Sequence, residues 1–130
     1  PTHSVSEASL QWNGAGRISA AWIEDGQVLA SGDVWRIPEF APVVLNRDPA
    51  ARARSPRILM PWSRVIFVEE APAGDRFEVR QPDDVSYTWH AWTPIETGRP
   101  VVDFAVNGDS AVTIVWSDDA GSVRLRVFNE

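Results

Sequence analysis

Apolar and polar residues alternate strictly toward the carboxyl end of the chain. In "VWSDDAGSVRLRVF" (115–128), a run ending at Trp116 meets a short polar turn, and a second alternating run follows it. Val112 and Ile114 share the face of Trp116 in the first run. Period-2 alternation on both sides of a turn rich in Ser, Asp and Gly is typical of an antiparallel β-hairpin.

The same pattern occurs twice more, in segments 17–35 and 63–81. Trp22, Val68 and Trp116 occupy corresponding places near the end of the first strand of each hairpin. A short apolar segment precedes each of the three hairpins, at 9–12, 57–62 and 101–106. A further apolar segment follows each of the first two hairpins, at 41–45 and 87–95. A four-stranded unit that recurs about every 45 residues is typical of β-propeller blades.

The pattern therefore predicts a single all-β domain over residues 1–130. Propeller-like four-stranded units are expected at about 9–45, 57–95 and 101–130. The last unit lacks a fourth strand, and "HSVSEASL" (3–10) is a candidate to supply it. A closed β-sandwich or β-barrel is the alternative fold.

A helical signal is confined to the connector 46–56. Asp48 is a candidate N-cap, Pro49 suits the first helical position, and Pro56 would end the helix. We expect one or two helical turns there and strands elsewhere.

Composition limits the functions to consider. A chain of 130 residues with 44% hydrophobic residues can bury a core of its own. A net charge of -6 argues against a nucleic-acid partner, because phosphate binding needs a basic surface. No apolar run approaches the roughly 18 residues of a membrane span, and no signal peptide is recognised, so the compartment stays unassigned.

The chain lacks the residues that several kinds of catalytic chemistry require. The chain has no Cys and no Lys, and His3 and His90 are its only histidines. Thiolate, Schiff-base and multi-histidine metal sites are therefore not expected, and no metal or cofactor is predicted. The segment "PDD" (82–84) and the pair Asp118 and Asp119 lack EF-hand spacing, and carboxylates are ordinary at turns.

The segment "YTWHAWTPIETGRP" (87–100) is the richest in candidate binding residues. Flat aromatic rings stack on sugars, and neighbouring polar groups can bond to hydroxyls. The candidates for a glycan site are Trp89, His90, Trp92, Glu96 and Arg99. The alternative is a strand lying between two packed layers, with its aromatic residues in the core.

Arginines cluster before and at the start of the second hairpin. Arg52, Arg54, Arg57 and Arg64, with Arg47 nearby, are candidates to bind an anion, because guanidinium groups match carboxylates and phosphates. The alternative is a solvated connector with surface ion pairs, each of which contributes little to stability.

The turn of the last hairpin suggests a family. Ser117-x-Asp119-x-Gly121 resembles the Asp-box, S-x-D-x-G-x-T-W, of the sialidase and BNR-repeat β-propellers, and departs from it at Val123 and Arg124. The resemblance implies a propeller fold, with these three residues shaping a turn at the outer rim of a blade. We expect Gly121 in a left-handed conformation and Asp119 accepting N–H groups of the turn.

The resemblance implies that catalysis in that family depends on a separate set of residues. These are three arginines that bind a carboxylate, a Tyr–Glu nucleophile pair and an Asp acid/base. The chain has one tyrosine, Tyr87, whose nearest candidate partners are Glu78 and Glu96. No catalytic residue is carried over, and a binding role is favoured over an enzymatic one.

We therefore expect a non-catalytic recognition or assembly module, with glycans as candidate ligands. Two alternatives remain: a sialidase-like glycoside hydrolase assembled across subunits, and a structural subunit of a larger particle. Because propellers close with four to eight blades, we expect a homodimer or a partner chain that completes the ring. No nucleic acid and no membrane is expected as a partner.

Overall fold

The computed structural model describes residues 4–12, 18–31, 42–83, 85–86, 88–108 and 111–130. Within these residues the chain forms strands and turns but no helix, and hence none that could cross a membrane. The strands are β1 (Val5–Trp12), β2 (Ile18–Glu24), β3 (Gln27–Ser31), β4 (Val43–Val44), β5 (Ala53–Leu59), β6 (Arg64–Ala71), β7 (Gly74–Asp83), β8 (Thr88–Ala91), β9 (Ile95–Glu96), β10 (Val101–Gly108), β11 (Val112–Asp118) and β12 (Val123–Val127). The all-β class predicted from the alternation is confirmed.

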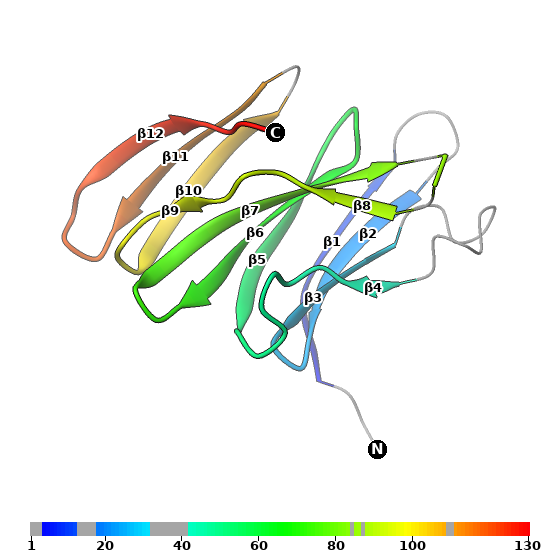
Figure 1. Cartoon of the computed structure of the whole chain (residues 1–130), viewed down its shortest axis with the longest axis horizontal. Coiled ribbons are helices and arrows are strands. Elements are labelled where there is room, and N and C mark those ends of the chain that lie inside the picture. The colour runs from blue at the N-terminus through cyan, green and yellow to red at the C-terminus, as the bar shows by residue number, and fades with distance from the viewer. Residues whose placement is uncertain (1–3, 13–17, 32–41, 84, 87, 109–110) are drawn as a thin grey trace.

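The strands form three antiparallel sheets that follow one another along the chain (Figure 1). The first sheet has the order β1-β2-β3-β4, the middle sheet β5-β6-β7-β8 with β9 also on β7, and the last sheet β10-β11-β12. Among the described residues no strand pair joins one sheet to another, so the alternative of a closed barrel is not seen.

In the middle sheet, β8 and β9 act together as the fourth strand. β8 pairs with the end of β7, where His90 lies opposite Gln81, and β9 pairs with its beginning, where Ile95 lies opposite Phe77. The N–H of Trp92 donates to the carbonyl oxygen of Val79 at 3.0 Å and continues the pairing between them. The outer edge of this sheet is therefore covered along most of β7.

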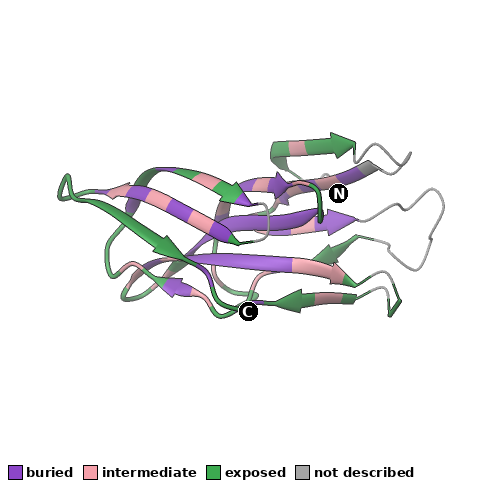
Figure 2. Ribbon diagram, turned by 90° about the horizontal axis from the view of Figure 1, so that it is seen from above, coloured by how far each residue is buried: buried purple, intermediate pink, exposed green. Residues whose placement is uncertain are grey.

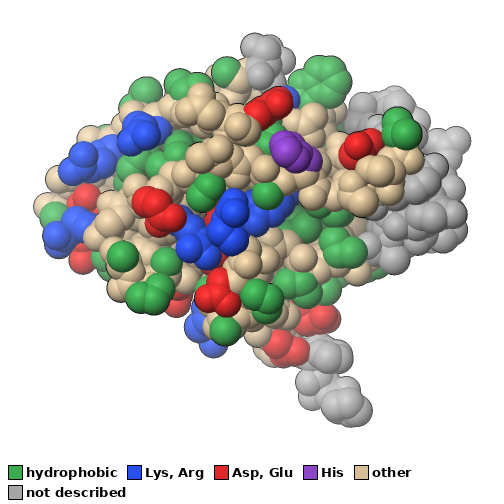
Figure 3. Space-filling model, viewed as in Figure 1, with side chains coloured by type: hydrophobic (Ala, Val, Ile, Leu, Met, Phe, Trp, Pro, Cys, Tyr) green, Lys and Arg blue, Asp and Glu red, His purple; other side chains and the backbone are tan. Residues whose placement is uncertain are grey.

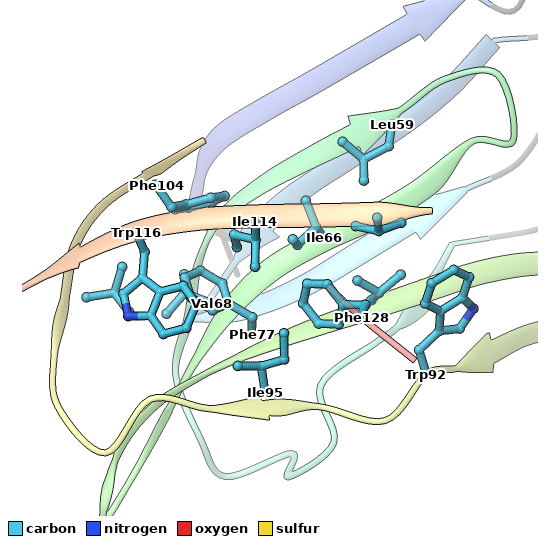
Figure 4. Close-up of a cluster of buried hydrophobic side chains, with 13 residues drawn as sticks. Leu59, Ile66, Val68, Phe77, Trp92, Ile95, Phe104, Ile114, Trp116 and Phe128 are labelled. Carbon is cyan, nitrogen blue, oxygen red and sulfur yellow. The ribbon is translucent and has the colours of Figure 1, made fainter. Parts of the chain in front are cut away.

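Both faces of the middle sheet are buried, because alternate residues of β6 and β7 point to opposite sides. Ile66, Val68, Phe77 and Val79 pack against the last sheet, where the ring centroid of Phe77 lies 5.3 Å from that of Trp116 (Figure 4). On the other side, the core shared with the first sheet contains Ala21, Ile23, Val28, Ala30, Leu45, Ala53, Ile58, Val65 and Phe67. Figure 2 shows buried residues concentrated in the middle of the molecule and exposed strands at its periphery.

The first strands of the three sheets contact one another. The backbone N–H of Ser55 on β5 donates to Oε1 of Glu7 on β1 at 3.2 Å. Arg57, also on β5, donates from Nη1 to the carbonyl oxygen of Phe104 on β10 at 2.8 Å. The sheets are therefore stacked side by side, with β1, β5 and β10 linked in series.

The predicted helix in 46–56 is wrong. The segment makes a single turn, in which the N–H of Ala51 donates to the carbonyl oxygen of Asp48 at 3.0 Å, and β5 begins at Ala53. Pro56 lies inside β5, at a shift in register between Arg54 and Arg57. Pairing with β6 outweighs the weak helical preference of the connector.

The segment 3–10 does not complete the last sheet. Its described residues belong mostly to β1, which pairs with β2 in the first sheet, with Leu10 opposite Ala20. Strands that are neighbours in sequence pair preferentially, so the local hairpin forms instead.

Trp22, Val68 and Trp116 do not occupy corresponding places, because Val68 faces the last sheet from the middle sheet and Trp116 faces the middle sheet from the last one. Those two are buried in the core between the middle and last sheets, whereas Trp22 is half-buried and its neighbours Ala21 and Ile23 face the core. Apolar residues line both faces of β2, so alternation alone does not choose the inner one.

The turn of the last hairpin uses a different acceptor from the one expected. Oδ1 of Asp118 accepts the N–H groups of Ala120 at 2.9 Å and of Ser122 at 3.1 Å. Asp119 instead accepts from Nε of Arg99 at 2.7 Å. Gly121 has φ of 80°, the left-handed conformation that the turn was expected to need.

We expect Gly121→Val to lower the free energy of unfolding by about 1–2 kcal/mol, because a β-branched residue is strained at positive φ. No atom outside the turn lies within 4 Å of an added Cβ, so the loss reports backbone strain alone. Urea denaturation measures it, with Gly121→Asn as the control, since Asn tolerates this conformation. Equal stability of the Val variant and the wild type would contradict the strain.

Candidate functional site

The candidates for a glycan site lie in different surroundings. Trp92 is 3% exposed in the core between the middle and last sheets, and the guanidinium carbon of Arg64 lies 4.7 Å from its ring centroid. Trp89 on β8 is half-buried and packs against the other core. His90 and Glu96 are exposed, on β8 and β9. The structure does not bring these side chains to one site.

Arg99, the remaining glycan candidate, lies in the connection between β9 and β10. Arg99 is half-exposed and pairs with Asp119 across the turn of the last hairpin, an interaction that raises the pKa of its guanidinium. Tyr87 and Asp84 lie outside the described residues. The Tyr–Glu pair of the sialidase resemblance is therefore not described here.

Trp89 does line a shallow pocket at the outer rim of the first and middle sheets. The pocket has a volume of about 450 Å³ and is lined by Val43, Val44, Leu45, Asn46, Arg47, Arg80, Thr88, Trp89 and Ala91. Its lining combines one aromatic ring, that of Trp89, with the polar side chains of Asn46, Arg47, Arg80 and Thr88. Of the five glycan candidates, Trp89 alone lines this pocket.

A buried network of charges holds the connector between the first two sheets. Glu78 on β7 is fully buried, and its carboxylate accepts from Nε of Arg47 at 2.7 Å and from Nη1 of Arg80 at 2.8 Å. Glu69 accepts the backbone N–H of Arg47 at 2.7 Å and also pairs with Arg76. The hydrogen bond with Glu78 raises the pKa of the Arg47 guanidinium, although burial opposes it.

Sequence reasoning missed this network, although β7 carries a signal of it. Arg76, Glu78 and Arg80 alternate with the buried Phe77 and Val79. On an exposed face such a row would be ordinary. Burial of both faces of the sheet is what makes it a structural network, and the alternation does not reveal that.

The arginine cluster is divided among contacts between sheets. Nη2 of Arg54 donates to Oδ2 of Asp75 at 2.6 Å and to the carbonyl oxygen of Val101 at 2.8 Å. The guanidinium carbon of Arg57 lies 3.8 Å from the ring centroid of Phe104. Their donors are thus directed to groups within the protein rather than to an open anion site.

The remaining two members of the cluster are also apart. Arg64 is 5% exposed and donates from Nε to Oε1 of Gln81 at 3.2 Å. Arg52 is exposed, and its side chain lies beside Gly26 in the turn between β2 and β3. The cluster in the sequence is therefore not a cluster in space around one pocket.

The acidic turns bind backbone groups. Oδ1 of Asp83 accepts the N–H groups of Val85 at 2.8 Å and Ser86 at 3.3 Å, and these bonds lower the pKa of Asp83 below its ordinary value. In the part of the chain that the structure describes, no group of three or more His, Asp or Glu side chains is placed to hold a metal ion.

In comparisons with known proteins, no family model and no curated protein matches the chain. The surfaces that the fold leaves open are then the guide to its function.

Proposed function

We propose that the chain is a non-catalytic recognition and assembly module, a propeller-like stack of three sheets that further sheets complete. The observation that supports this proposal is the apolar character of both outer faces of the stack. These are the faces of the first and last sheets that point away from the middle sheet.

The outer face of the first sheet consists of positions that alternate with the buried Ala21 and Ile23. Its apolar members are Leu10, Trp12, Ala20, Trp22, Leu29 and Val44. Leu10 and Trp12 are 66% and 67% exposed, a high value for large apolar side chains on one strand. Soluble monomers rarely leave such a row in water, so the face is suited to a partner.

The outer face of the last sheet has the same character. Val123, Leu125 and Val127 lie on β12 opposite Ser117, Val115 and Thr113 of β11. These positions alternate with the buried Ile114 and Trp116 and are therefore directed away from the middle sheet. The three β12 side chains are 72%, 65% and 50% exposed.

A two-fold symmetric dimer of this chain would bury both outer faces at once. The outer face of the first sheet of one protomer would pack on the outer face of the last sheet of its partner, and the reverse contact would follow by symmetry. The result has six sheets, within the range of four to eight in which propellers close. A different chain with sheets of the same kind is the other partner that fits these faces.

We expect the chain at micromolar concentration to have the mass of two copies in multi-angle light scattering. Leu10→Lys should shift the protein to the mass of one copy, because burying an unpaired ammonium in the interface is costly. Val85→Lys is the matched control, since Val85 is an 88% exposed apolar residue at the β7–β8 turn and outside both faces.

A monomeric wild type that is folded and shows no tendency to associate would overturn the assembly role. A glycan array tests the recognition role of the rim pocket that contains Trp89. Hydrolysis of a fluorogenic sialoside by the purified chain would contradict the non-catalytic assignment and favour the hydrolase alternative.

A further inference from the structure

The last sheet has an open edge on β12. Two backbone hydrogen bonds lie at the two ends of the β11–β12 ladder. The N–H of Phe128 donates to the carbonyl oxygen of Val112 at 2.8 Å, and the N–H of Asp118 donates to the carbonyl oxygen of Ser122 at 3.1 Å. Hydrogen-bonded pairs alternate in an antiparallel ladder, so the backbone N–H and C=O groups of Arg124 and Arg126 bond to β11. The N–H and C=O groups of the residues between them point to the open side.

A groove of about 330 Å³ runs beside this edge, lined by Glu96, Thr97, Trp116, Arg124, Leu125 and Arg126. One wall belongs to β9 of the middle sheet and the other to β12. The segments just before β9 and just after β12 are joined by a hydrogen bond, in which the N–H of Thr93 donates to the carbonyl oxygen of Asn129 at 3.1 Å. The groove thus lies where a fourth strand of the last sheet would run.

The groove contains unused polar groups. Register places Arg124 opposite Trp116 and Arg126 opposite Ile114, so both guanidinium groups belong to the face that borders the middle sheet. Neither forms an ion pair among the described residues. The indole Nε1 of Trp116 is buried and has no hydrogen-bond partner within the same residues. Figure 3 shows basic side chains at the surface in the region of β12.

We propose that β12 docks an extended acidic segment of a partner protein as the fourth strand of the last sheet. Carboxylates at alternate positions of that segment face Arg124 and Arg126, which stand about 6.6 Å apart at the spacing of alternate strand residues. Apolar residues between them extend the outer row of Val123, Leu125 and Val127. This inference rests on the recognition role proposed above and names its partner class.

A second copy of β12 fits the edge poorly. Two antiparallel β12 strands that align their apolar faces would place Arg124 of one beside Arg126 of the other, and like charges opposite each other destabilise a sheet. A segment from another protein, with charge opposite to that of the edge, is the occupant that these contacts favour.

The test uses fluorescence anisotropy of a labelled seven-residue peptide in which Glu and Val alternate, titrated with the whole chain. We expect saturable binding that weakens at least tenfold with Arg124→Glu or Arg126→Glu. Arg52→Glu is the matched control, because it reverses the charge of an exposed arginine remote from the groove and should leave binding unchanged. Replacing Glu by Lys in the peptide should abolish binding.

A second peptide separates strand addition from simple charge attraction. N-methylation of alternate amides on one edge removes the backbone donors that would pair with β12, and should also abolish binding. Equal binding of the acidic and basic peptides, or an unaltered affinity after N-methylation, overturns the proposal. A dimer that binds no acidic peptide would refute this docking edge alone, whereas a monomer that binds it would refute the assembly role alone.

Discussion

Glu78→Gln should lower the free energy of unfolding by about 3–5 kcal/mol, because it leaves the buried guanidinium of Arg80 without its counter-charge. The side chain of Glu78 is 0% exposed and that of its partner Arg80 is 6% exposed. The same carboxylate holds Arg47 through two donors, at 2.7 and 2.9 Å. Urea denaturation monitored by circular dichroism measures the loss.

Glu130→Gln is the control for this substitution. It removes the same charge from an exposed residue that forms no ion pair among the described residues. We expect a change within about 0.5 kcal/mol, as is usual for surface positions. If both variants lose the same small amount, Glu78 is not the centre of a buried network.

Phe77→Ala should cost about 3–5 kcal/mol, the range for removing a buried phenylalanine. Phe77 is 0% exposed, and its ring lies edge-on to Phe104 of β10 at 5.2 Å and to Trp116 of β11 at 5.3 Å between centroids. It therefore joins the middle sheet to the last one (Figure 4). The free energy of unfolding is again the measured quantity.

Val85→Ala is the control for the core variant, because it shortens an apolar side chain that is 88% exposed and lies outside both outer faces. Its loss should stay under about 0.5 kcal/mol. A small loss for Phe77→Ala, comparable with that of the control, would mean that the last sheet contributes little to the cooperative unit.

Alternation predicted the strands well where only one face of a sheet is buried. Val112, Ile114 and Trp116 alternate with half-buried residues and all three lie in the core. In β2 and β6 both faces carry apolar residues, so the same alternation did not determine whether Trp22 points toward the core or away from it. That choice depends on the neighbouring sheet, which a local pattern does not contain.

The arginines show a second limit of sequence reasoning. Arg54 and Arg57 are neighbours in the chain and look like a solvated basic cluster. Their partners, Asp75, Val101 and Phe104, lie in strands that are distant in sequence. The sequence pattern predicted no binding role for Arg124 and Arg126, because only the strand order reveals that β12 is an open edge.

The buried face of the first sheet has a consequence for synthesis of the chain. β1 to β4 precede all of the residues that cover them, so on a translating ribosome Ala21, Ile23 and Val28 emerge without Val65 and Phe67. The nascent sheet keeps an apolar face in water until β6 has left the exit tunnel. At about 5–20 residues per second this interval lasts seconds, long enough for a chaperone to bind the nascent face.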